Sequence, residues 1–304
     1  MTTVAQQDFQ SRLTTEHLLI PSRVKGISGQ GPVFVDLRKR LDRRIDGLVA
    51  DEGMTALEFP PLEPKADMES VGYPTSFPHL LGAISVFEGT EPEALVLAET
   101  AHKHEDWSGH LVGSDLVLVP AACHPIYPAV AAMGPIPPDG LSVDGGAAWV
   151  FRHEPSDEPT RLQAFHQREL VRFGSNDDVL DWRDRWRERA LGLATALQLT
   201  AELDEANDPF FGRSGRMLAR NQRQQALKFE LLVPVGGEQP TAVASFNAHG
   251  DHFATTFGVS AADGSSVHTA CLGFGLERWV LALLFTHGTD PAAWPAGVRS
   301  ELAL

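Results

Sequence analysis

Two cysteines stand in short motifs whose residue types could carry out chemistry. Cys123 opens the stretch CHPIYP and Cys271 opens CLGFGLERW, 148 positions later (271 minus 123), and the 304-residue chain has no third cysteine. Thiols in a reducing compartment are free or metal-bound more often than they are paired as a disulfide. The two motifs therefore indicate either a thiolate metal site or two buried apolar thiols.

Charged side chains alternate along a predicted β-hairpin. Its strands cover GGAAWVFRHE (145–154) and TRLQAFHQRELVRFGS (160–175), joined by PSDEP. Because side chains repeat every second residue on a strand, Arg152 and Glu154 share one face of the first strand. The same alternation gives the second strand a face made of Arg161, Gln163, Phe165, Gln167 and Glu169. Charged groups gathered on one sheet face indicate a bound ligand.

A further cation is predicted at the start of a helix. The stretch GFGLERWVLALLF is bounded by glycines, carries Arg278 in its first turn and ends at Gly288. It lacks the third glycine of a dinucleotide-binding fingerprint and does not open a first βαβ unit, which argues against a Rossmann domain. A guanidinium beside glycines at a helix N-terminus suits phosphate oxygens. The alternative is an arginine that caps the helix or pairs at the surface.

Several other elements would have to position these residues. A helix over 36–50 has Leu and Ile at helical spacing, and a short strand in TALEFPPL follows it and stops at two prolines. SDLVLVPAAC is predicted to be a buried strand that delivers Cys123 at its end, and KFELLVPV and TAVASFNAHG are predicted to be later strands. The chain thus alternates helices and strands without an internal repeat.

The clearest predicted helix lies in SNDDVLDWRDRWRERALGLATALQL, which begins at Ser175. Ser175 with Asp178 three residues later is typical of a helix start. An apolar stripe at helical spacing follows, made of Val179, Trp182, Trp186, Ala190, Leu193 and Leu197. The arginines between these positions form either an ordinary solvated face or a docking surface.

Composition limits the class of protein. Hydrophobic residues make up 43% of the chain, enough for the core of one large domain. The net charge of −15 disfavours a nucleic-acid partner, because it repels a phosphate backbone. The N-terminus lacks an apolar segment behind a basic start, and no run is long enough to cross a bilayer. We therefore expect a cytoplasmic protein with no membrane partner.

The order of these motifs resembles a known family. The helix and strand that stop at proline, then FRHE, then GFGLER are similar, in that order, to motifs one, two and three of class II aminoacyl-tRNA synthetases. PAACHPIYP and HTACLGFGLERW sharpen the likeness to the seryl-synthetase-like amino acid:carrier-protein ligases, from about residue 35 to 290. The resemblance implies an α+β fold with an antiparallel sheet flanked by helices. We expect one catalytic domain over 1–304, with a helical insertion at about 176–225.

The resemblance also implies a zinc site. In ordinary seryl synthetases the segment similar to LVPAAC ends in a glutamate that receives the substrate's amino group, and here Cys123 stands at that place. The family's two cysteines and a glutamate map onto Cys123, Glu169 and Cys271, which would hold one zinc ion per chain. Three ligands leave a fourth position open, as in catalytic zinc sites. On chemical grounds alone the rival ligands are His124, His102 and His104.

The remaining implied site residues bind ATP with Mg²⁺. Arg152 would contact the α-phosphate and the substrate carboxylate, and Glu154 the adenine amino group. Arg278 would hold the γ-phosphate, so Arg152 and Arg278 are the expected catalytic residues. Arg161 with the backbone of Leu162, and the AVAS segment Ala242, Val243, Ala244 and Ser245, would complete the ATP site. Without the family, AVAS reads equally well as a plain buried strand.

The implied reaction joins a small amino acid, glycine or alanine, to the phosphopantetheine thiol of a carrier protein through an aminoacyl-adenylate. About 35 residues before motif one and a six-residue connection at 155–160 leave little to grip a tRNA. We expect the carrier to dock on 176–200, where arginines would offset its acidity. Motif one implies a homodimer. The alternatives are a truncated seryl-type tRNA synthetase and a catalytically silent regulatory paralogue.

Overall fold

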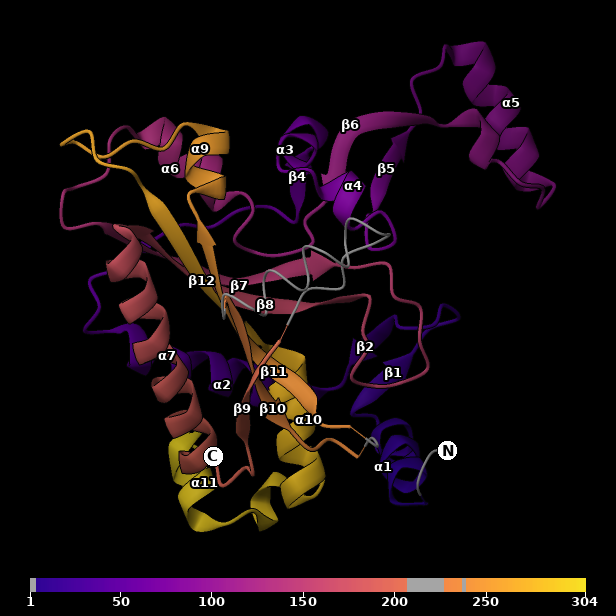
Figure 1. Cartoon of the computed structure of the whole chain (residues 1–304). Coiled ribbons are helices and arrows are strands. Elements are labelled where there is room, and N and C mark those ends of the chain that lie inside the picture. The colour runs from indigo at the N-terminus through magenta and orange to yellow at the C-terminus, as the bar shows by residue number, and fades with distance from the viewer. Residues whose placement is uncertain (1–3, 207–226, 237–238) are drawn as a thin grey trace.

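A computed structural model describes residues 4–206, 227–236 and 239–304 (Figure 1). The chain starts with α1 (Val4–Thr15), a two-stranded ribbon of β1 (Leu19–Pro21) and β2 (Ser28–Gln30), and α2 (Pro32–Val49). The helix predicted over 36–50 is confirmed, but α2 begins four residues earlier. Pro32 explains the earlier start, because its fixed φ suits the first helical position, where no backbone N–H is needed.

A seven-stranded sheet forms the centre of the fold. Its spatial order is β3 (Thr55–Ala56), β7 (Leu141–Phe151), β8 (Ala164–Gly174), β12 (His268–Gly275), β11 (Thr241–Gly250), β10 (Lys228–Val233) and β9 (Glu202–Glu205). Every neighbouring pair is antiparallel except β3 and β7. The predicted hairpin is therefore confirmed as β7 and β8, and so are the strands predicted from KFELLVPV and TAVASFNAHG.

The ends of the predicted hairpin differ from the expectation. Arg161 is not part of β8, so the prediction that it shares a strand face with Glu169 is wrong. Its backbone N–H donates to the carbonyl of Glu158, and its side chain pairs with the Glu158 carboxylate at 3.0 Å. Arg152 and Glu154 likewise follow the last residue of β7. The charged ends of the hairpin thus lie in the connecting loop, where backbone turns set their direction.

The two faces of the sheet have different roles. Even-numbered side chains such as Leu170, Leu272 and Phe246 are fully buried with apolar residues of α2, α7 (Asn176–Ala196) and α10 (Leu276–His287). Because side chains alternate on a strand, odd-numbered residues of β8, β11 and β12 point to the opposite face. Helices α6 (Ile126–Met133) and α9 (His252–Phe257) lie at one end of the sheet (Figure 1) and join the apolar cluster around Cys123 and Cys271.

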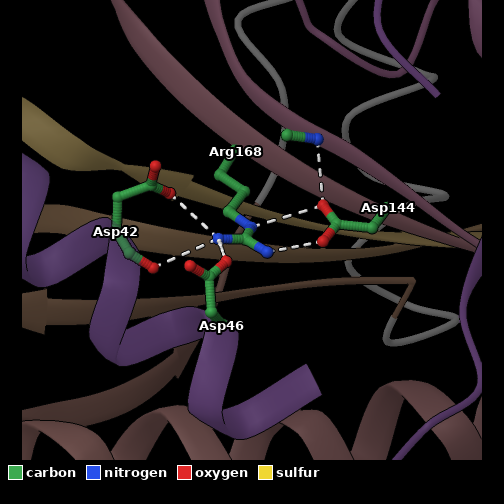
Figure 2. A network of polar contacts seen from close by, with 5 residues as sticks. Asp42, Asp46, Asp144 and Arg168 are labelled. Atoms are coloured by element: carbon green, nitrogen blue, oxygen red, sulfur yellow. Dashed lines mark hydrogen bonds and ion pairs between the residues drawn. The ribbon is translucent and has the colours of Figure 1, made fainter. Parts of the chain in front are cut away.

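A buried arginine fastens α2 to the hairpin (Figure 2). The Arg168 side chain is 4% exposed and pairs with Asp144 of β7 and with Asp42 and Asp46 of α2. Asp144 also accepts from the N–H of Gly146 at 2.9 Å, within the register shift of β7. Burial alone would lower the pKa of Arg168, but these carboxylates raise it above its ordinary value. The network therefore fixes the Arg168 guanidinium on the sheet face opposite to that of Glu169, the next residue of β8.

An excursion between β3 and β7 builds a smaller, three-stranded sheet in the order β4 (Leu62–Pro64), β6 (Val112–Leu118), β5 (Ala83–Val86). It also holds α3 (Lys65–Ser70), α4 (Tyr73–Ser76), α5 (Glu91–His102), which projects from the body (Figure 1), and the 3-10 helix Ser108–His110. The predicted strand TALEFPPL is split between β3 and β4 by its prolines. The buried strand expected to end at Cys123 is wrong in two respects: β6 ends at Leu118 and is mostly exposed.

Helix α7 confirms its predicted start and apolar stripe. The Ser175 side chain accepts from the N–H of Asp178 at 3.3 Å, and all six stripe residues are buried. The expectation of a basic outer surface is wrong for two arginines, because Arg183 is buried and the guanidinium of Arg187 lies 3.7 Å from the ring centroid of Phe229. The exposed charged residues in the middle of α7 are Asp181, Asp184, Arg185 and Glu188, whereas Arg187 and Arg189 are half-buried.

The chain ends in the 3-10 helix Pro291–Ala293 and α11 (Ala296–Glu301). Within the predicted insertion, the residues after α7 lead into β9 of the central sheet, and the remainder, at 207–225, lies outside the described residues. None of the helices in the described ranges is long and apolar enough to cross a membrane.

Candidate active site

Cys123, Glu169 and Cys271 meet on the sheet face opposite α2, α7 and α10. One ligand atom from each lies within 4.8 Å of the others, and all three residues are buried. Glu169 and Cys271 belong to adjacent strands, where Gly273 is paired with Glu169 and Cys271 is two residues further along the same face. Cys123 arrives from the turn that leads into α6. The alternation of two strands and one loop end thus gathers residues that are far apart in the sequence.

Backbone and amide groups fix the Glu169 carboxylate. The N–H of Cys123 donates to Oε2, and Gln167 Nε2 donates to Oε1 at 3.1 Å. The Gln167 Oε1 atom in turn accepts from the N–H of Ala122 at 3.3 Å. Gln167 therefore ties the strand that carries one candidate ligand to the loop that carries another.

Cys271 is contacted by polar side chains of β11. Asn247 Nδ2 lies 3.4 Å from the Cys271 Sγ atom, and His249 Nε2 lies 3.6 Å from it. His249 Nδ1 is 3.1 Å from the hydroxyl of Thr269. Neither Asn247 nor His249 was predicted from the sequence. The alternation of polar residues in FNAHG was the available signal, but it identifies a face only once the register of β11 against β12 is known.

The electrostatics of the three residues fit a bound cation. A hydrogen bond from the Cys123 thiol, together with burial, raises the pKa of Cys123, and the same bond lowers the pKa of Cys271. Burial, with the Cys271 thiolate, raises the pKa of Glu169 to about 8. Without a cation, Cys123 and Glu169 therefore favour their neutral forms beside the Cys271 thiolate, because three adjacent buried anions would repel one another. A divalent cation would offset this repulsion, and two thiolates with one carboxylate are a donor set that suits zinc.

The rival histidine ligands lie elsewhere. The His124 ring packs against the rings of Tyr73 and Phe253, and burial lowers the pKa of His124 to about 3. His102 ends α5 and His104 follows it, and both are exposed. Within the described ranges, these histidines belong to no group of metal-binding side chains, whereas Cys123, Glu169 and Cys271 do.

Two arginines lie within each other's electrostatic reach, and one of them, Arg152, also acts on Glu169. Arg152 Nε donates to the carbonyl of Pro120 at 2.8 Å, and its guanidinium stands 5.6 Å from the ring centroid of Phe165. Arg278 donates to the carbonyls of Thr160 and Ala242, at 2.9 and 3.0 Å. Burial, and then the charge of Arg152, lower the pKa of Arg278. Two guanidiniums held within each other's field make a place where an anion is stabilised.

The other predicted ATP residues lie around the arginines. Glu154 and Arg161 are both within the electrostatic reach of Arg278, although Arg161 is exposed and bonded to Glu158. Leu162 is 9% exposed and precedes β8. The AVAS residues Ala242, Val243, Ala244 and Ser245 lie in β11, and Ala242 offers its carbonyl to Arg278. The guanidiniums and the residues around them are thus connected through Arg152 to Glu169 and the two thiols.

Comparison with known proteins first defines the class. No family model matches the chain. The structure of the Methanopyrus kandleri seryl-tRNA synthetase, in complex with tRNASec of A. aeolicus, superposes with a TM-score of 0.85 at 23% identity. It covers 98% of this chain, which spans 60% of that synthetase. The fold is therefore that of the class II aminoacyl-tRNA synthetases.

Two sequence relatives narrow the class. Amino acid–acyl-carrier-protein ligase 1 of Bradyrhizobium diazoefficiens is 49% identical over 255 residues, which is 84% of this chain and 78% of the relative. Ligase 2 of the same organism is 45% identical over 280 residues, 92% of this chain and 83% of the relative. This chain belongs to the amino acid–acyl-carrier-protein ligase family.

Proposed function

We propose that this ligase uses ATP to activate a small amino acid and transfers it to the phosphopantetheine thiol of a carrier protein. The main supporting observation is that three buried candidate metal ligands meet on one sheet face, while the charge of Arg152 reaches both Glu169 of that group and Arg278. One end can hold a primary amine and the other can hold phosphates. An amino acid and ATP placed this way would have the carboxylate next to the α-phosphate.

We propose that Cys123, Glu169 and Cys271 hold one zinc ion, which would supply a Lewis-acidic position for the substrate's amino group. The closeness and burial of the three side chains support this set. An active preparation should hold about one zinc per chain, and Cys123→Ser should lower both zinc content and activation. A fully active preparation without zinc would contradict the assignment.

In the proposed activation step, a carboxylate oxygen of the amino acid attacks the α-phosphorus of ATP, and pyrophosphate leaves. Arg152 would neutralise the carboxylate and the α-phosphate, and Arg278 the outer phosphates, while a bound Mg²⁺ would supply further positive charge to the triphosphate. Glu154 would accept from the adenine amino group, and Arg161, the Leu162 backbone and Ala242 to Ser245 would contact the nucleotide. Hydrogen bonds to backbone carbonyls hold both catalytic guanidiniums in place before substrate arrives.

In the second step the carrier thiol attacks the aminoacyl carbonyl, and AMP leaves with the electron pair of the broken C–O bond. We retain the proposal that the carrier docks on 176–200. Arginines would contribute little to this docking, because Arg185 is the one basic residue among the four exposed charged residues at the centre of α7. Apolar and hydrogen-bonding contacts, rather than a basic surface, would then dominate the docking.

The substrate we propose is glycine, with alanine second. A fixed amine and a fixed carboxylate leave selectivity to the space around the α-carbon. Amino-acid-dependent exchange of pyrophosphate into ATP, measured over the twenty amino acids, tests activation directly. Strong exchange with glycine or alanine supports the proposal, and exchange with serine alone would overturn the choice of substrate.

A truncated seryl-type tRNA synthetase is the second candidate, because the superposed M. kandleri enzyme is a tRNA complex. The net charge of −15 and the family relationship favour the carrier instead. We further propose that the chain acts as one catalytic domain with α7 as the start of its helical insertion.

A further inference from the structure

Two nitrogen atoms of β11 converge on the Cys271 sulfur. Asn247 is the direct register partner of Cys271 across the β11–β12 pair, and its Nδ2 lies 3.4 Å from Sγ. His249, which lies in the register shift of β11 between Ala248 and Gly250, places Nε2 3.6 Å from Sγ. The Asn247 contact follows from the strand register, since directly opposite residues meet in an antiparallel pair, and the His249 contact arises at the bulge that follows.

The His249 ring is held from its other side as well. Its Nδ1 lies 3.1 Å from the hydroxyl of Thr269, a residue with no exposed surface. The rings of Phe253 and Tyr127 meet the imidazole edge-on, with centroids 4.9 and 6.1 Å away. These contacts leave the ring little freedom to turn away from the sulfur.

Hydrogen-bonding capacity then fixes the direction of each contact. A metal-bound thiolate can only accept, so the Asn247 amide N–H and the His249 Nε2–H must be the donors. A neutral imidazole that donates from Nε2 presents Nδ1 as an acceptor, and the Thr269 hydroxyl can donate to it. Every polar atom of the chain Thr269–His249–Cys271 is satisfied in this arrangement.

We infer that Asn247 and His249 are positioning residues that donate two hydrogen bonds to the Cys271 thiolate and thereby tune its bond to the metal, with Thr269 orienting His249. This inference rests on the proposed metal site. Hydrogen bonds withdraw electron density from the sulfur and hold its rotamer toward the other ligands. Loss of such a supporting contact typically weakens metal binding about 10–100-fold.

Cobalt-substituted protein tests the inference without a turnover assay, because thiolate-to-Co²⁺ charge transfer reports the electron density on sulfur. His249→Phe keeps a ring but removes both nitrogens, and Asn247→Leu keeps the approximate shape of the amide. We expect each to shift the charge-transfer band and to lower zinc affinity about 10–100-fold in a chelator competition. His249→Gln, which returns an N–H donor, should restore much of the wild-type band.

Two further variants sharpen the result. Thr269→Val should act like a weaker His249 variant, because it removes only the group that orients the ring. His252→Phe is the matched control, since His252 packs on Phe253 from α9, and it should leave the spectrum unchanged. Thermal melts of the metal-loaded proteins identify any variant that fails to fold, and Thr269→Val then carries the test.

The possible outcomes distinguish the proposed metal site from the proposed hydrogen bonds to Cys271. A wild-type protein that binds neither Co²⁺ nor Zn²⁺ would overturn the proposed metal site. Metal binding with an unchanged band and affinity in the folded His249, Asn247 and Thr269 variants would overturn this inference and leave the site standing. A His249→Gln variant as impaired as His249→Phe would show that ring packing, not hydrogen-bond donation, matters.

Discussion

At the scale of single residues, the site depends on side chains that the strands bring to one face. Gly273 shows how little space remains there. A Cβ at this position would lie 2.7 Å from Gln167 Nε2 and 2.9 Å from Glu169 Oε1. Both atoms belong to hydrogen bonds that orient Glu169, so they have no room to retreat without disturbing the candidate ligand.

We therefore expect Gly273→Ala to displace Glu169 and to lower zinc content and amino-acid activation at least 10-fold, as for other losses of ligand support. Gly275→Ala is the control for zinc content, because its added Cβ would meet only ordinary contacts, the nearest at 3.6 Å. Metal analysis of both purified variants makes the comparison. Equal zinc in Gly273→Ala and wild type would refute the packing argument.

Glu63 of β4 is a buried carboxyl outside the proposed site. It is 1% exposed, and neither carboxylate oxygen has a hydrogen-bond partner among the described residues. Burial, and then the charge of Asp67, raise the pKa of Glu63 to about 8. The folded protein therefore keeps Glu63 protonated at neutral pH, while the unfolded chain ionises near pH 4.5.

This difference in pKa predicts that the free energy of unfolding depends on pH. Glu63 does not change the stability below the pKa of the unfolded chain. Between that pKa and pH 8 the free energy of unfolding falls by about 1.4 kcal/mol for each pH unit, and above pH 8 it changes no further. Glu63→Gln removes the titration, so it should gain stability relative to wild type as pH increases from 5 to 8. Denaturant unfolding at both pH values measures this. A difference between variant and wild type that does not depend on pH would argue against a protonated Glu63.

At the scale of elements, Arg168 connects three parts of the fold. Its guanidinium is 4% exposed, whereas Asp46 is 60% exposed and Asp144 is 13% exposed. Removing one partner of a buried ion pair leaves the other charges uncompensated and typically costs about 3–5 kcal/mol. An exposed partner contributes about 0–1 kcal/mol.

Arg168→Ala should therefore destabilise the protein by about 3 kcal/mol or more, and Asp46→Ala by less than about 1 kcal/mol. Because Arg168 precedes Glu169 on β8, the first variant should also reduce zinc content. Chemical denaturation of the two variants under one set of conditions gives the comparison. Similar losses of stability in both variants would contradict the argument that the buried Arg168 contributes more to the network in Figure 2 than the exposed Asp46.

Sequence reasoning succeeded for elements with strong local signals. The stripe and start of α7, the extent of β11 and the end of α10 at Gly288 follow from periodicity, capping and glycine. It failed where backbone turns or tertiary packing determine where a side chain lies. Arg161 was predicted to lie in a strand but lies in a turn, where it is bonded to Glu158. Arg187 packs on Phe229, although its spacing in the sequence predicted a charge facing solvent.

The candidate site likewise contains residues that were predicted from the sequence and residues that were missed. Cys123, Glu169, Cys271, Arg152 and Arg278 were predicted from the resemblance in motif order; the first three lie together in the structure, and Arg152 acts electrostatically on both Glu169 and Arg278. Gln167 was predicted only as a neighbour on the ligand face, and Asn247 and His249 were missed. Their contacts depend on the registers of β8, β12 and β11, which no local pattern in the sequence specifies.

At the scale of the whole molecule, we predict a symmetric homodimer, because motif one builds the twofold interface in the resembled class. Helix α2 and the short strand β3 are the corresponding elements here. Light scattering at micromolar concentration should give twice the mass of the chain. The mass of a single chain over that concentration range would contradict the prediction.

The central claim is that the amino acid is delivered to a carrier protein. The most direct measurement is the intact mass of a phosphopantetheinylated carrier after incubation with the enzyme, ATP, Mg²⁺ and glycine or alanine. The same carrier without its prosthetic group is the control, and unfractionated tRNA is assayed in parallel. We predict that the carrier gains the mass of one aminoacyl residue only when ATP and the phosphopantetheine arm are both present, while tRNA stays uncharged. Charging of tRNA with no gain on the carrier would contradict the account.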